Sequence, residues 1–424
     1  MRLSFVLCNL ILFSIAAAAQ GDDYRTLNDC MAGDYQRSIH ACTALIERDG
    51  HSPAHAANLH TLRGLAQAEA ENRDAAIADF DTATRLAPQA FGTYQLRGLV
   101  YQTIGKGDRA QADLGRALDL LRETRMQPSG DAIQHYCMGV ALQSFGTTLA
   151  AIASYTSAID ADMRLAAAYV RRGEIYAKRA EFPPMRHELP QAIADFDKAI
   201  ALDPGYSTAY LERAEAHELD GKPEMAFVDF AKAIEIEPLY ASAYYRRGTA
   251  YLKQGKHVEA VADFGKTIEL RPAFREAYLN RGVTYDAMGQ YDRAIADFDK
   301  AIEFNPRAAR AYGNRARAHE KKGELTRAIA DWDRAIEFSP GSFDARVFRG
   351  RAYLSTGQTD SAIAEFDAAI QLNARYAPAY HGRGEAYEKK TDRDRAILDH
   401  RRALSLDASL EASRAALRRL NAEP

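Results

Sequence analysis

The clearest pattern along the chain is a set of small, aromatic and proline positions that recur every 34 residues. In the second half of the chain a small residue keeps this step at Gly248, Gly282, Ala316, Gly350 and Gly384. A large ring keeps it at Phe264, Phe298, Trp332, Phe366 and His400, as do Tyr244, Tyr278 and Tyr312, and Pro238, Pro272, Pro306 and Pro340. Because several residue classes share one period, the pattern indicates a tandem structural repeat.

Each unit of this period predicts two helices. Residues 277–285 carry apolar or small side chains at helical spacing, and Gly289 ends the segment as a C-terminal glycine does. Residues 292–304 predict a second helix with Ala294, Ile295 and Phe298 on one face, and Pro306 cannot continue it. A helical hairpin of this size cannot bury its apolar face alone, so the units are expected to stack.

The unit resembles the tetratricopeptide repeat, which has an aromatic residue fourth, Gly or Ala eighth, Tyr eleventh, Ala twentieth, an aromatic twenty-fourth and Pro thirty-second. Residues 207–342 match nearly throughout, Gly64, Gly98, Gly139 and Gly173 mark earlier copies, and 343–410 continue the frame. The resemblance implies an all-α, right-handed superhelical solenoid of about eleven hairpins. It also implies that the first helix of each hairpin lines a concave groove for a peptide or partner helix.

Four segments follow from this frame: a signal peptide at 1–19, a degenerate first repeat at 20–56, the tandem array at 57–410, and a capping helix and tail at 411–424. The signal peptide rests on a basic start, an apolar run over 3–15 and an alanine exit, with cleavage expected after Ala19. An uncleaved anchor is the alternative. Insertions around 182–185 and 127–130 lengthen one turn and one link.

Export predicts a periplasmic or secreted protein with no stable membrane insertion after cleavage, and it affects the cysteines. Cys30 and Cys42 lie twelve residues apart across a predicted helix-to-helix turn, which favours a disulfide. The alternative is two separate buried thiols. Cys137 is then expected to be a free, packed thiol.

The seventh and twenty-third positions of the repeat vary together. Arginine stands at the seventh at Arg63, Arg97, Arg172, Arg213, Arg247, Arg281, Arg315, Arg349 and Arg383, and an acid at the twenty-third in the same copies. The copy with Met138 instead has Ser154 where the acid is expected. This covariation predicts a ladder of Arg–carboxylate pairs that tie first helices to second helices, within a repeat or across neighbours. The alternative is an arginine stripe that binds an anionic ligand.

Composition and motifs argue against the other common functions. The formal net charge of -3 gives no overall electrostatic case for nucleic acid, whose binding would require a strongly basic face. No catalytic or phosphate-binding motif occurs, and His51, His55 and His60 lack a carboxylate or thiolate at ligand spacing. His217, His319, His400 and Trp332 occupy core positions of the repeat. We therefore expect neither an enzyme nor a cofactor or metal.

The candidate site is the groove-facing side of the first helices. Carried over from the resemblance, partner-binding residues are Tyr245, Thr249, Asn280, Arg310, Asn314, Arg317 and Arg351. The basic residues favour a protein or peptide partner with an acidic segment. Asn280 and Asn314 suit capture of a C-terminal carboxylate, but Tyr245 and Thr249 replace the lysine and asparagine that such capture uses. The expected function is a scaffold or adaptor; a self-associating structural protein or an envelope assembly factor of chaperone type are alternatives, and the oligomeric state is open.

Overall fold

The computed structural model describes residues 35–48, 51–125 and 147–423, together with Thr26, Cys30, His135, Tyr136, Gly139, Leu142 and Gln143. The predicted signal peptide, the link at 127–130, Cys137 and Met138 lie outside the described residues. The chain divides into two compact units, 1–243 and 244–424, whose boundary falls inside helix α13. Each unit is described by itself.

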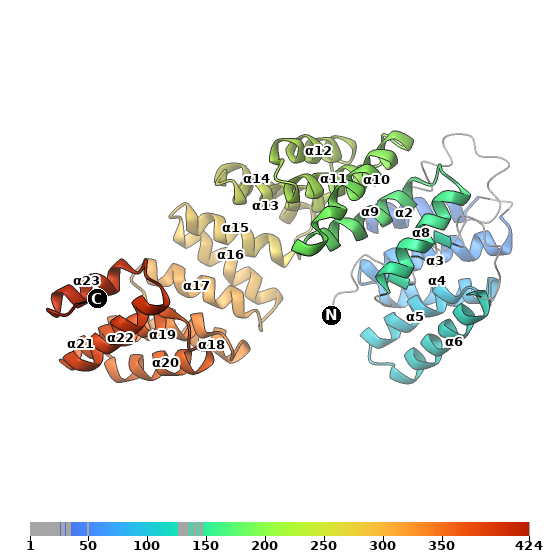
Figure 1. Cartoon of the computed structure of the whole chain (residues 1–424). Helices are drawn as coiled ribbons and strands as arrows, with labels where there is room; N and C mark the ends of the chain where they lie inside the picture. The colour runs from blue at the N-terminus through green and yellow to red at the C-terminus, as the bar shows by residue number, and fades with distance from the viewer. Residues whose placement is uncertain are drawn as a thin grey trace. The chain divides into compact units, whose positions relative to one another are not determined.

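The first unit is built from helices in antiparallel pairs (Figure 1). Its described helices are α2 (Tyr35–Ile46), α3 (Pro53–Glu69), α4 (Arg73–Leu86), α5 (Phe91–Thr103), α6 (Gly107–Arg125), α8 (Thr148–Ala161), α9 (Ala166–Ala180), α10 (Leu189–Leu202), α11 (Ser207–Leu219) and α12 (Pro223–Ile236). A 3-10 helix, η1 (Pro183–Glu188), fills the predicted insertion between α9 and α10.

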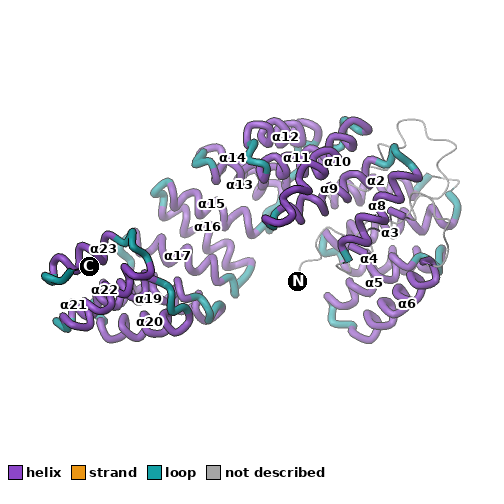
Figure 2. The backbone as a smooth tube through the Cα atoms, viewed as in Figure 1, coloured by secondary structure: helices purple, strands orange, loops and turns teal. Residues whose placement is uncertain are grey.

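The second unit continues the same pairing. Its helices are α13 (Ala241–Lys253), which begins in the first unit, α14 (His257–Leu270), α15 (Arg275–Ala287), α16 (Tyr291–Phe304), α17 (Ala309–Lys321), α18 (Leu325–Phe338), α19 (Phe343–Ser355), α20 (Thr359–Leu372), α21 (Ala377–Lys389), α22 (Arg393–Leu406) and α23 (Glu411–Arg419). Over the described residues the chain consists of helices joined by short turns, with no strand (Figure 2). The predicted all-α repeat solenoid is confirmed.

The hairpin of α15 and α16 shows why the repeat needs its small and aromatic positions. Phe298 is fully buried, and a Cβ placed on Gly282 would lie only 2.7 Å from its ring. Glycine therefore permits the two helices to approach closely around the ring. Gly289 has a φ of 73°, which an L-residue rarely adopts, and it ends α15 before the chain reverses.

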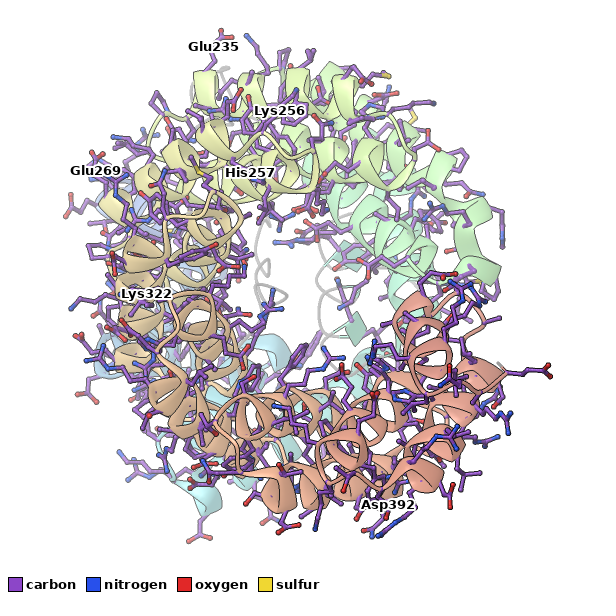
Figure 3. All side chains as sticks on the ribbon, turned by 90° about the vertical axis from the view of Figure 1, so that its left-hand side faces the viewer. Glu235, Lys256, His257, Glu269, Lys322 and Asp392 are labelled. Carbon is purple, nitrogen blue, oxygen red and sulfur yellow. A yellow bond between two sulfur atoms is a disulfide. The ribbon has the colours of Figure 1, made fainter. Side chains whose placement is uncertain are left out.

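Neighbouring hairpins pack mainly through successive helices, such as α14 on α15 and α16 on α17. First helices of adjacent hairpins also touch, for example α15 with α17 and α19 with α21. We call the side of the second unit that the first helices α13, α15, α17, α19 and α21 present the first-helix face. Side chains on the second helices include the exposed Glu269, which points outward into solvent (Figure 3).

The two ends of the array differ from its middle. Near the N-terminus a disulfide joins Cys30 to Cys42 of α2, with the Cα atoms 4.8 Å apart, as the spacing predicts. At the C-terminus α23 follows the last complete hairpin and buries Ser413, Ala416 and Leu417. None of the described helices combines the length and apolar composition needed to cross a bilayer.

Candidate functional site

The covarying arginines and acids meet inside each hairpin. In Arg281, for example, Nε donates to Asp297 Oδ2 at 2.8 Å and Nη2 donates to Oδ1 at 2.7 Å. The same two-pronged geometry joins Arg63 to Asp79, Arg97 to Asp113, Arg172 to Asp195, Arg213 to Asp229, Arg247 to Asp263, Arg315 to Asp331 and Arg383 to Asp399. Arg349 reaches Glu365 through one bond of 2.5 Å. The Arg–carboxylate ladder therefore lies within repeats, one of the two arrangements that the covariation allows.

A second set of bonds joins neighbouring repeats, and sequence reasoning missed it. The remaining guanidinium nitrogen, Nη1, donates to an acid sixteen residues upstream: Arg97 to Asp81 at 2.7 Å, Arg213 to Asp197 at 2.6 Å, Arg349 to Asp333 at 2.6 Å, Arg383 to Asp367 at 2.5 Å, and Arg315 to Asp299. Thr43 and Thr156 take the place of the acid for Arg63 and Arg172. The available signal was a second acid two positions after the ladder acid, as in Asp297-Phe298-Asp299.

These bonds leave the ladder arginines occupied. The hydrogen bond to Asp297 raises the pKa of Arg281 despite partial burial, and the neighbouring Asp297 charge adds to the shift. The fourth-position tyrosine lies against the same guanidinium, with Arg281 Cζ 5.7 Å from the Tyr278 ring centre. The ladder is thus a structural element, and its geometry does not favour the alternative of an anion-binding arginine stripe.

Tyr245, Thr249 and Asn280 lie together on the first-helix face. Asn280 Nδ2 donates to the Tyr245 hydroxyl at 3.1 Å, across two hairpins. The centres of the Tyr245 and Phe274 rings lie 4.9 Å apart. Burial raises the pKa of the Tyr245 hydroxyl, and the charge of Glu276 adds to the rise. The Thr249 hydroxyl donates to the Tyr245 carbonyl of its own helix. The structure thus brings these three residues together, but it uses the amide of Asn280 internally.

Arg310, Asn314 and Arg317 follow on α17. Arg310 and Arg317 are exposed, and Arg317 Nη2 donates to Asn314 Oδ1 at 2.5 Å. Asn314 itself is 8% exposed, and its Nδ2 has no partner in the described chain. Arg310 is close enough for its charge to act on the pKa of Tyr245. The Asn314 amide is therefore a donor beneath Arg317 rather than the open groove residue that the sequence predicted.

Arg351 on α19 is exposed and has no ion pair among the residues that the structure describes. Its charge acts on three nearby groups: Glu320, Tyr376 and His381. Burial raises the pKa of Glu320, and the charges of Arg317 and Arg351 oppose that rise. Burial and the Asp344 carboxylate raise the pKa of Tyr376 to about 12. Arg351 therefore stands in a mixed polar patch on the first-helix face.

Where the twenty-fourth position of a repeat carries a ring with a polar atom, that atom bonds to a side chain on the first helix of the same hairpin. This contact was not predicted from the sequence. Trp332 Nε1 donates to Glu320 Oε1 at 2.8 Å, Tyr155 donates to Gln143 at 2.9 Å, and His400 Nε2 lies 2.9 Å from Glu388 Oε1. In each case the partner lies twelve residues upstream. The predicted core placement holds for Trp332, His217, His319 and His400, all of which are buried.

The early histidines do not form a ligand set. His60 Nδ1 lies 2.8 Å from the ladder acid Asp79, and the ring of His51 packs on that of His55. Across the described ranges, no group of three His, Cys, Asp or Glu side chains is arranged to hold a metal ion.

An all-α array of stacked helical hairpins defines a helical-repeat protein. Tetratricopeptide repeat models match residues 32–91, 186–241, 279–343, 241–274 and 377–410, and a TPR repeat model matches 350–390. The chain belongs to the tetratricopeptide repeat family. Proteins of this family generally act as protein–protein interaction scaffolds.

Comparison with curated proteins finds no match. Among solved structures, a tetratricopeptide repeat protein from Parabacteroides merdae is 20% identical, with 59% of this chain and 98% of that one covered and a TM-score of 0.45. Yeast Tom70 is 16% identical, with 95% of this chain and 96% of that one covered and a TM-score of 0.42. YrrB, described as a TPR protein with an unusual peptide-binding site, is 23% identical over 45% and 97%, with a TM-score of 0.39. The family models, not these likenesses, carry the assignment.

Proposed function

We propose that this protein is a non-catalytic scaffold that binds a protein or peptide partner on the first-helix face of its second unit, and that the bound segment is acidic. The observation that carries the proposal is a contrast between two sets of arginines. The ladder arginines are held by carboxylates in every repeat that has them. Arg310 and Arg351 are exposed and have no ion pair within the described residues, and Arg317 bonds only to a neutral amide.

Neighbouring groups suit an extended partner. Tyr245 offers a half-buried ring, and the charge of the exposed Arg310 reaches it. A partner's side-chain carboxylate could accept from the exposed Arg317 guanidinium, which would exchange its bond to the neutral Asn314 amide for one to a charged group. Glu320 balances part of the local positive charge, so recognition would depend on placement of the acids and not on bulk charge alone.

The proposed location is the cell envelope or outside the cell. The basic and apolar start of the chain and the Cys30–Cys42 disulfide both support it, since disulfides persist in oxidising compartments.

Fluorescence anisotropy with labelled oligo-glutamate and oligo-lysine peptides tests the partner chemistry. The full chain should bind the acidic peptide more tightly, and the combined change Arg310→Glu, Arg317→Glu and Arg351→Glu should weaken binding by about tenfold or more. The control matched in charge reverses three exposed cations on the second helices α16 and α18, Arg293→Glu, Lys300→Glu and Arg327→Glu, and should leave binding nearly unchanged. Equal affinity of the reversed and control variants for the acidic peptide would contradict the proposed surface.

A further inference from the structure

The interface between the last hairpin and α23 is polar where the preceding interface is apolar. In the interface one repeat earlier, the matching positions are Val347, Phe366 and Ala379, which pack in one apolar cluster. In the last interface they are His381, His400 and Ser413. Three polar residues thus replace three apolar ones together, at the contact with α23.

These polar groups contact one another. His381 Nδ1 shares a hydrogen bond of 2.9 Å with Ser413 Oγ of α23, and the two histidine rings lie 5.3 Å apart between centres. Ser413 and His400 are fully buried, and His381 is 8% exposed. His400 Nδ1 has no partner in the described chain. Both rings are therefore enclosed, and α23 supplies part of the cover.

Charged groups on α19, α21 and α23 lie near the two histidines. Glu385 Oε1 lies 3.5 Å from His381 Nε2 on α21, and Glu388 on the same helix lies 2.9 Å from His400 Nε2. Arg419 of α23 donates to both oxygens of Glu388 at 3.2 Å. The charge of Arg351 on α19 lowers the pKa of His381, while α20 contributes the apolar Phe366. Two carboxylates thus favour a charged histidine, and burial, Arg351 and the second ring oppose it.

We propose that the contact of His381 with Ser413 and the His400 ring makes α23 a pH-responsive cap, which is docked when His381 is neutral and released when it takes up a proton. A charged His381 ring would sit beside a second imidazole and under a helix that separates it from water, so loss of α23 would hydrate it. The surface of α22 uncovered on release corresponds to the surfaces by which α16, α18 and α20 pack on the next hairpin.

The direction of the effect follows from linkage. Burial lowers the pKa of His381, and His400 and Arg351 lower it further against the opposing carboxylates. The docked state therefore binds fewer protons than the released state. Docking is complete above the ordinary histidine pKa of about 6.5 and weakens as the pH falls below it. Each proton taken up can change the docking equilibrium by at most about tenfold per pH unit.

Hydrogen exchange of the full chain at about pH 7.5 and pH 5.5 tests the cap, with protection factors that correct for the intrinsic exchange rate. Protection of α23 should fall at the lower pH, while protection of α15 and α16 in the middle of the unit should hold. In the variant His381→Val with His400→Phe, which restores the residues of the preceding repeat, α23 protection should no longer depend on pH. His217→Tyr, a change to a buried histidine in the first unit, should keep the wild-type response.

Circular dichroism establishes that the double variant is folded. Should it be unfolded, the single variant His381→Val decides the question, and it should respond less to pH than the wild type. The proposal is overturned if α23 protection in the wild type is the same at both pH values, or if the folded variants lose protection as much as the wild type.

Discussion

Removing one partner of the Arg281–Asp297 pair should destabilise the α15–α16 hairpin far more than removing an exposed acid from the same helix. The Asp297 side chain is 8% exposed and that of Arg281 is 22% exposed. A fully buried pair that loses one partner costs about 3–5 kcal/mol, because the remaining charge is stranded. Since the guanidinium keeps some contact with water, we expect about 2–3 kcal/mol for Asp297→Ala.

Asp299→Ala is the internal control, because Asp299 lies two residues further along α16 and bonds to Arg315 of the next repeat. Its side chain is 53% exposed, so its loss should cost no more than about 1 kcal/mol. The cycle of Arg281→Ala, Asp297→Ala and the double variant should show a coupling energy of about 1–2 kcal/mol, because the second change removes a charge that the first had stranded.

Native-state hydrogen exchange in α15 and α16 is the suitable assay, because repeat arrays do not unfold as one two-state unit. Two results would refute the reasoning. One is that the two single changes add to within about 0.5 kcal/mol. The other is that Asp299→Ala costs as much as Asp297→Ala.

Three further predictions concern single contacts. Glu320→Ala should leave the buried Trp332 indole without an acceptor and lower stability by about 1–3 kcal/mol, whereas Glu320→Gln should lower it less. Urea unfolding, followed by the fluorescence of the sole tryptophan in the sequence, measures both variants. Equal losses of stability would contradict the hydrogen-bond account. Gly282→Ala should lower stability by about 1–3 kcal/mol, because the new Cβ would lie 2.7 Å from the Phe298 ring. Gly265→Ala in α14 should stabilise that helix by about 0.5–1 kcal/mol, because its Cβ would lie 3.8 Å from Arg281 Nη1, which is an ordinary contact. Thermal melts should show a lower melting temperature for the first variant and a higher one for the second. Reduction of the Cys30–Cys42 disulfide should lower the protection of α2 by about 2–4 kcal/mol in hydrogen exchange, and Cys30→Ser with Cys42→Ser should abolish the effect of reductant.

Much of the fold could be predicted from local spacing alone. The 34-residue period, the small residue at Gly282 and the aromatic at Phe298 each reflect one hairpin, and a hairpin is formed by residues close in the chain. The pairing of the ladder arginines with the acids was also predictable, since one copy loses both partners together, but that covariation left open whether each pair lies within a repeat or across neighbours. Cys30 and Cys42 were close enough in sequence for their pairing to be inferred from one turn.

Contacts between repeats could not be predicted from local spacing. Asn280 was expected to offer its amide to a partner, but that amide donates to Tyr245, which lies 35 residues upstream on the previous first helix. Asn314 was expected to line an open groove, but it is 8% exposed beneath Arg317. Whether these side chains are buried or bonded to a neighbouring repeat depends on the rotation of each hairpin against the next.

The sequence by itself thus determined the helical hairpins, their repetition, and the arginine and acid that hold each one together. Only the tertiary structure decided which arginines remain unpaired on the first-helix face, which acids bond to the neighbouring repeat, and that His381 meets Ser413 under α23. The physical reason is that periodicity specifies contacts inside a repeat, whereas contacts between repeats depend on the angle and distance at which one packed hairpin meets the next.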